Sequence, residues 1–105
     1  MPKYSLVFPE GFDDYAWEVQ AKGWFADAML LSLGRQYRIN FYDPVRLGQE
    51  IESEHKRGGV FFEQNLVVVQ SVTRPNMEKA MNFLMESGQA SSLIAEQMPQ
   101  DGQEV

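Results

Sequence analysis

The chain has 105 residues, of which 44% are hydrophobic, and its nine basic and fifteen acidic residues give a formal net charge of −6. This length suits one domain, and the hydrophobic fraction can supply a core without a disulfide or a structural metal, which excludes wholesale disorder. The acidic balance opposes binding to nucleic acid or to an anionic membrane, because such binding depends on lysine and arginine.

The sequence has no segment typical of export or of a membrane span. No apolar run approaches the roughly 20 residues that cross a bilayer, and residues 1–8 lack the long apolar region of a secretory signal. The absence of cysteine removes disulfides and thiolate ligands and favours a reducing compartment. We therefore expect a soluble, cytoplasmic protein with no nucleic-acid or membrane partner.

The first third of the chain predicts two strands and one ambiguous segment. Alternating apolar and polar side chains predict strands over residues 3–8 and 25–33. Between them, residues 13–22 allow two interpretations. An acidic N-cap favours a helix, whereas the alternation of Tyr15 and Trp17 favours a strand.

A hairpin is predicted between residues 25–33 and the strand over residues 37–42. Gly34-Arg35 suits a two-residue turn, but the register of that turn would pair apolar side chains of one strand with polar side chains of the other. The buried face predicts instead a three-residue loop that pairs Leu33 with Tyr37. In that register the outer face of the hairpin carries the following side chains: Ala28, Leu30, Ser32, Arg38, Asn40 and Tyr42.

The second half of the chain predicts helix, strand and helix. Asp43-Pro44 is a favourable start for a helix over about 44–57, which ends at Gly58-Gly59. The apolar run that begins the segment 66–72 predicts an interior strand covered on both faces. A second helix starts after Thr73 and ends at Gly88. Its apolar stripe consists of Met77, Ala80, Met81 and Leu84.

Together these elements predict one α+β domain over residues 1–96. We expect a mostly antiparallel sheet of four or five strands with two or three helices on one face. If residues 13–22 are helical, the first six elements follow the βαββαβ order of a ferredoxin-like sandwich, with one more helix at the C-terminus. If they form a strand, the sheet is a meander. Residues 97–105 are polar and contain proline and glycine, which predicts a flexible tail.

One corner of this fold is a candidate for recognition. Helical periodicity places Leu47, Ile51 and His55 toward the body of the domain and leaves the other side of the helix outward. The candidate binding residues are Tyr42, Arg46, Gln49 and Arg38. A purely structural interpretation is also open, in which Asp43 only caps the helix and Arg46 pairs with Glu50 at i+4.

The sequence shows no constellation typical of catalysis or of metal binding. His55 is the only histidine, so Glu52-x-x-His55 is half of a paired metal motif at most. No serine lies in a nucleophile elbow, and no phosphate-binding glycine motif is present. We predict no catalytic residue, no metal and no cofactor.

The favoured function is therefore a noncatalytic domain that binds a protein partner through its outer sheet face and its acidic surface. Three alternatives stay open. The domain could form a homodimer, act as an immunity-type inhibitor of a basic toxin, or hold a small ligand or substrate in a pocket near Tyr42 and Arg46.

Overall fold

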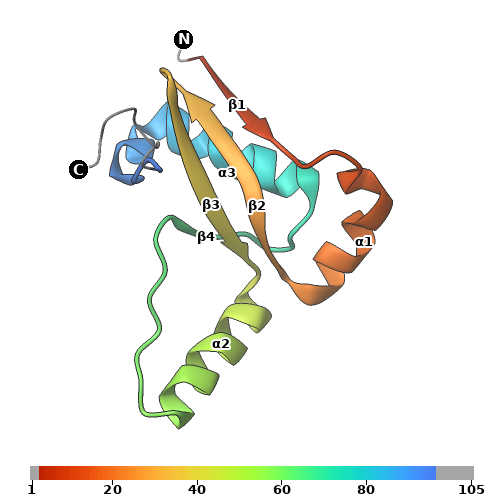
Figure 1. The fold of residues 1–105 in the computed structure, drawn as a ribbon, viewed down its shortest axis with the longest axis vertical. Helices are drawn as coiled ribbons and strands as arrows, with labels where there is room; N and C mark the ends of the chain where they lie inside the picture. Colours follow the sequence, from red (N-terminus) through yellow and green to blue (C-terminus); the bar gives the residue numbers. More distant parts are fainter. Residues whose placement is uncertain (1–2, 97–105) are drawn as a thin grey trace, which may run out of the picture.

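The structure, a computed structural model, describes residues 3–96, which form four strands and three α-helices (Figure 1). In chain order they are β1 (Tyr4–Val7), α1 (Phe12–Lys22), β2 (Trp24–Ser32), β3 (Arg35–Tyr42), α2 (Pro44–Lys56), β4 (Leu66–Val68) and α3 (Arg74–Ser87), followed by a 3-10 turn, Gln89–Ser92. The α+β class is confirmed, and the segment 13–22 is helical. The predicted tail, residues 97–105, lies outside the described residues.

The four strands form one sheet in the order β1-β2-β3-β4. The first two pairings are antiparallel, and β3 and β4 are parallel because α2 makes the crossover between them. A ferredoxin-like sandwich places another strand between the two strands of each βαβ unit. Here β1 and β2 are direct neighbours, so the chain has the element order of that fold but a different sheet.

The predicted hairpin register is wrong. Ser32 pairs with Arg35 and Leu30 pairs with Tyr37, which leaves a two-residue turn of Leu33 and Gly34. Both turn residues have left-handed backbones, with φ of 52° and 76°. Two consecutive positive φ values match the twist of the two strands, which explains why this turn closes the hairpin.

As a result, the face predicted to be outer on β2 is the core face. Ala28 and Leu30 are fully buried there, beside Ile39 of β3. From the other side α3 contributes Met77 and Met81, as its apolar stripe predicts. Both methionines belong to the same buried cluster as Ala28, Leu30 and Ile39, so α3 covers this face.

The strand β4 also differs from its prediction. It has three residues and lies at the edge of the sheet, whereas the apolar run predicts an interior strand. Val67 and Val69 pack on the core, but Leu66 and Val68 are 36% and 47% exposed on the other face. The run is apolar on both faces although only one face is covered among residues 3–96.

The helices do not all cover the sheet. Both α1 and α3 contribute buried residues to the core, whereas α2 contributes none and extends beyond the end of the sheet (Figure 1). Leu47 and Ile51 are only half-buried, and His55 is exposed rather than turned inward. The segment that follows α2 runs back toward the sheet on one side of this helix (Figure 1). No helix within residues 3–96 has the length and apolar character of a membrane span.

Candidate functional site

The end of α1, the end of β3 and the start of α2 meet at one corner of the fold. Gly23 ends α1 with a left-handed φ of 74°, and its carbonyl accepts a hydrogen bond from Asp43 N at 2.9 Å. The side chain of Asp43 then accepts from Arg46 N at 2.7 Å, which confirms Asp43 as the N-cap of α2. The direction of α2 is therefore fixed at its first turn.

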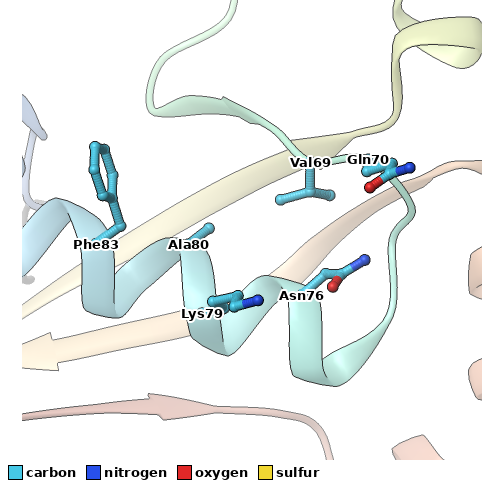
Figure 2. Close-up of a pocket in the computed structure, with 6 residues that line it drawn as sticks. All are labelled: Val69, Gln70, Asn76, Lys79, Ala80 and Phe83. Carbon is cyan, nitrogen blue, oxygen red and sulfur yellow. The ribbon is translucent and has the colours of Figure 1, made fainter.

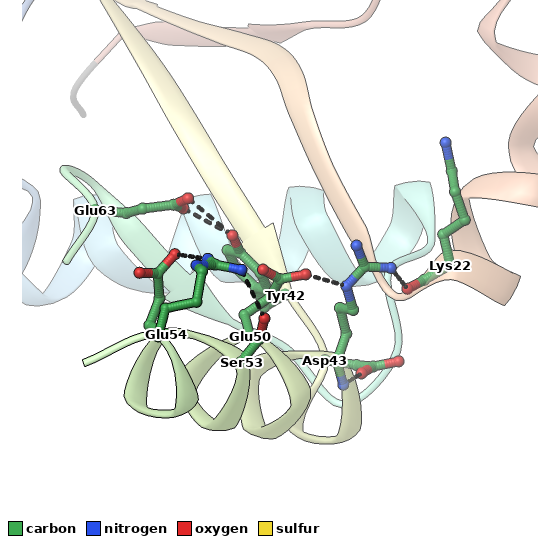
Figure 3. A network of polar contacts seen from close by, with 9 residues as sticks. Lys22, Tyr42, Asp43, Glu50, Ser53, Glu54 and Glu63 are labelled. Atoms are coloured by element: carbon green, nitrogen blue, oxygen red, sulfur yellow. Dashed lines mark hydrogen bonds and ion pairs between the residues drawn. The ribbon is translucent and has the colours of Figure 1, made fainter. Parts of the chain in front are cut away.

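Tyr42 lies at the centre of this corner. Its side chain projects from the sheet face opposite the core, yet the residue is only 3% exposed. The rings of Trp24 and Phe61 lie 6.4 and 6.0 Å from its ring, centroid to centroid. Its hydroxyl donates to both carboxylate oxygens of Glu63 at 2.9 Å (Figure 3). Tyr42 is thus a buried anchor for the segment that returns from α2, not an exposed contact.

The surroundings of Tyr42 hold its phenol neutral. Burial raises the pKa of Tyr42 far above its usual value near 10, and the hydrogen bond to Glu63 raises it further. The negative charges of Glu63 and Glu50 act in the same direction, and Arg46 opposes them. At neutral pH Tyr42 is therefore uncharged, and its hydroxyl donates a hydrogen bond to the carboxylate of Glu63.

Arg46 is held in place from two sides. Its Nε lies 2.8 Å from Glu50 Oε2, and one guanidinium nitrogen donates to the carbonyl of Lys22 at 3.3 Å (Figure 3). The i+4 pairing of the structural interpretation is thus observed. Farther along α2, the guanidinium of Arg57 contacts Ser53 and Glu54 in the same way. These contacts align one side of α2 into a row of mutually satisfied polar groups.

A small pocket opens beside this row. It has a volume of about 200 Å³ and is lined by Trp24, Tyr42, Arg46, Glu50 and Glu63. Trp24 Nε1 is buried and has no hydrogen-bond partner within the described part of the chain. The pocket thus offers the N–H of Trp24 and the carboxylate of Glu63, which accepts from Tyr42 and from no other side chain within residues 3–96. None of the five described residues that line it is a nucleophile paired with a base.

The four candidate binding residues do not form one patch. Tyr42 and Arg46 share the pocket, whereas Gln49 is exposed on α2 and its side chain makes no hydrogen bond to any residue from 3 to 96. Arg38 lies on β3, on the same sheet face as Tyr42, and its Nε is 2.8 Å from Glu96 Oε2. A second carboxylate, Asp27, lies 3.8 Å from the same guanidinium.

The sheet face that carries Arg38 is uncovered by any helix of the described chain. In Figure 1, α3 crosses behind the sheet and leaves the near face open. We define the open sheet face by its outward side chains: Ser5, Val7, Asp27, Met29, Leu31, Gln36, Arg38, Asn40, Leu66 and Val68. Five of these ten are apolar, and four of the five have more than a third of their surface exposed, namely Val7 at 45%, Leu31 at 37%, Leu66 at 36% and Val68 at 47%.

Sequence reasoning missed several residues of these surfaces. Glu63 and Trp24 complete the corner around Tyr42, but they lie about 20 residues from it in opposite directions along the chain. No local pattern links positions so far apart. The outward orientation of Leu31 was also not predicted, because it depends on the register of the hairpin.

A groove beside α3 is a further candidate surface. It has a volume of about 450 Å³, and its lining residues are Val69, Gln70, Asn76, Lys79, Ala80 and Phe83 (Figure 2). Lys79 is the one charged residue among these six described residues. Within residues 3–96, no cluster of three or more histidine, aspartate or glutamate side chains could hold a metal ion.

Comparison with protein-family models, with curated proteins and with solved structures found no match to this chain. Its function has therefore to be inferred from its own surfaces.

Proposed function

We propose that this chain is a noncatalytic domain that binds a protein through the open sheet face. The observation that carries the proposal is the exposure of large apolar side chains on a sheet face without a covering helix. A sheet face that is exposed only to water normally carries polar side chains at its outward positions. Here the outward positions include Met29 and Leu31 on the central strand β2, which is the pattern of a face that is buried in a complex.

Polar groups on the same face support a specific contact. Arg38 lies between the carboxylates of Asp27 and Glu96, and all three side chains retain substantial exposure. Charges of both signs beside an apolar surface fix the orientation of a partner and disfavour incorrect partners. On the open sheet face the polar side chains of β3 therefore lie between apolar side chains of β1 and β2 on one side and of β4 on the other.

The corner around Tyr42 supports a noncatalytic role. The neutral phenol donates to Glu63, and Arg46 is engaged by Glu50 and by the carbonyl of Lys22. Each of these groups has a structural partner, so none is poised to exchange a proton with a substrate. Their arrangement positions α2 relative to the sheet.

Site-specific photo-crosslinking tests this proposal. A benzophenone amino acid replaces Leu31 on the open sheet face, and a matched control replaces Glu78 on the exposed side of α3. After irradiation in cells of the native organism, crosslinked products are identified by mass spectrometry. We expect one discrete protein adduct at position 31 and none at position 78. No adduct at 31, or the same adducts at both positions, would contradict the proposal.

Self-association through the same face is a second candidate. Arg38 and Asp27 lie close together there, so a twofold pairing of two copies could bring each charge opposite its complement. In that case the adduct at position 31 is a second copy of the chain. Light scattering at two concentrations must then give a dimer, which the substitution Leu31→Glu abolishes. A monomer at both concentrations excludes this candidate.

A further inference from the structure

A second surface follows the edge of β4 that does not pair with β3. In the order β1-β2-β3-β4 this strand is last, so one side of its backbone has no neighbouring strand among residues 3–96. The carbonyl of Asn65 accepts a hydrogen bond from β3 at 3.0 Å, and Val69 N donates one to β3 at 2.9 Å. The direction of the backbone groups alternates along a strand, so the N–H and C=O groups of Leu66 and Val68 point to the free side.

The outward backbone groups of Leu66 and Val68 form an open strand edge. Outside the ladder with β3, neither residue makes a backbone hydrogen bond to the described part of the chain. Residues 64–73 contain no charged side chain and no proline, which are the residues that commonly protect an edge from pairing. The other edge strand, β1, lies between Lys3 and Pro9. Of the two edges, that of β4 is therefore the one open to a further strand.

A groove runs along this edge, with α3 as its opposite wall. Its first part has a volume of about 370 Å³ and is lined by Leu66, Val67, Val68, Leu84, Gln89, Ser92 and Leu93. Consecutive side chains of a strand point to opposite faces, so a hollow bordered by all three residues of β4 lies along its edge. Its second part is the groove of about 450 Å³ in Figure 2. Val69 directly follows β4 and Phe83 directly precedes Leu84, so the two parts lie end to end.

The helix wall of this groove is apolar and carries one positive charge. Phe83 and Ala80 project from α3 on the side of Val69, and Phe83 is 59% exposed (Figure 2). The ammonium group of Lys79 has no carboxylate within 4 Å among residues 3–96. A complementary occupant therefore brings an apolar side chain to Phe83 and a negative charge to Lys79.

We propose that an extended segment of a partner protein binds in this groove as a fifth strand of the sheet. Its backbone pairs with the outward N–H and C=O groups of Leu66 and Val68, and these bonds supply affinity. Every second side chain of the segment points toward α3, where an apolar residue contacts Phe83 and an acidic residue lies beside Lys79. This surface differs from the open sheet face, because it uses the backbone edge of β4 and not the outward side chains of the sheet.

Charge distinguishes this occupant from a second copy of the chain. Pairing of two β4 strands would bring residues 64–73 of the second copy into the groove, and that stretch has no carboxylate to place beside Lys79. The carboxylate that precedes the stretch, Glu63, already accepts from the hydroxyl of Tyr42. A partner segment with an acidic residue satisfies both the strand edge and Lys79.

Backbone amide signals in nuclear magnetic resonance test this proposal. The full chain, labelled with nitrogen-15, is titrated with a synthetic peptide of four alternating valine and threonine residues with a glutamate at each end. We expect the amide signals of Leu66 and Val68 to shift and their exchange with solvent to slow by roughly tenfold, because these donors become paired. The signals of Ser5 and Val7 on β1 should not change. A control peptide of the same sequence, methylated on every backbone nitrogen, cannot pair as a strand and should shift none of these signals.

One substitution with a matched control tests the charge. Lys79→Glu should weaken binding of the peptide roughly tenfold, because the new carboxylate repels its glutamates. The control Lys22→Glu makes the same change of charge at the end of α1, does not line the groove, and should bind as the unmodified chain does.

Five results would overturn the proposal. Three are unmoved signals of Leu66 and Val68, equal binding of the methylated peptide, and undiminished binding by Lys79→Glu. The fourth is a set of shifts confined to Leu31 and its neighbours, which would assign the peptide to the open sheet face. The fifth is a shift of the Leu66 signal with protein concentration alone, which would assign the edge to a second copy.

Discussion

Gly23 packs directly against the carboxyl group of Asp43, so that a Cβ atom at position 23 would lie 2.6 Å from Asp43 Oδ2. The backbone of Gly23 is also left-handed, which costs any other residue about 1–2 kcal/mol. We therefore expect Gly23→Ala to lower the free energy of unfolding by about 2 kcal/mol or more. Urea denaturation measures this loss.

Gly48 provides the matched control for that substitution. It lies within α2 with no positive φ, and no atom would contact an added Cβ within 4 Å. Gly48→Ala should raise the free energy of unfolding by about 0.5–1 kcal/mol, because alanine loses less backbone freedom in a helix. Equal changes in the free energy of unfolding for the two substitutions would show that the close approach to Asp43 does not affect stability.

Removal of the cap tests the other side of the same contact. Asp43→Ala leaves Arg46 N without its side-chain acceptor, so the protein should lose about 1 kcal/mol of stability. Asp43→Asn keeps an oxygen at the same place and should lose only a few tenths of that amount, about 0.3 kcal/mol. Thermal unfolding of both variants gives the comparison. A larger loss for asparagine than for alanine would contradict the capping role.

The sequence predicted these helix ends well because capping is local. Asp43, Thr73 and Gly88 each act on backbone groups only a few residues away, and each occupies the predicted cap in the structure. The helical stripe of α3 was equally predictable, since Met77 and Met81 repeat with the period of the helix and lie buried. Sequence patterns that act within one or two helical turns therefore predict the folded structure correctly.

The β2–β3 hairpin was mispredicted because both of its faces are apolar enough to be buried. Leu31 suggested one face and Leu30 the other, and in the structure Leu30 is buried whereas Leu31 is 37% exposed. The same limit applied to the candidate site. Tyr42 was expected on an exposed face, but Phe61 and Glu63 cover it after a chain excursion of about 20 residues. Periodicity specifies the side of a strand that a residue occupies, not what later covers that side.

Arg46 gives a prediction that separates structure from recognition. Its side chain is about a third exposed and contacts both Glu50 and the carbonyl of Lys22. Arg46→Ala should therefore lower stability by about 1 kcal/mol, near the upper limit for a surface ion pair because a backbone carbonyl also loses its donor. Gln49→Ala, on the exposed side of α2, should leave the melting temperature unchanged. An unchanged melting temperature for Arg46→Ala would contradict a stabilising role for these contacts.

Tyr42 makes the stability of the protein sensitive to alkaline pH. Because burial and the hydrogen bond to Glu63 raise the pKa of Tyr42, the folded chain keeps a phenolic proton that the unfolded chain releases above about pH 10. The folded state then binds more protons than the unfolded state. The contribution of Tyr42 to the free energy of unfolding is therefore complete below about pH 10 and is lost as the pH rises further.

In Tyr42→Phe no proton is released at this position, and the alkaline decline in stability should be smaller. The same variant should lose about 2 kcal/mol at neutral pH, since Glu63 is left without its donor. Glu63→Gln retains an acceptor but lacks the charge, so its alkaline decline should fall between those of the other two proteins. Urea denaturation at a series of pH values measures all three, and identical declines in the parent and Tyr42→Phe would show that the proton on Tyr42 is not linked to folding.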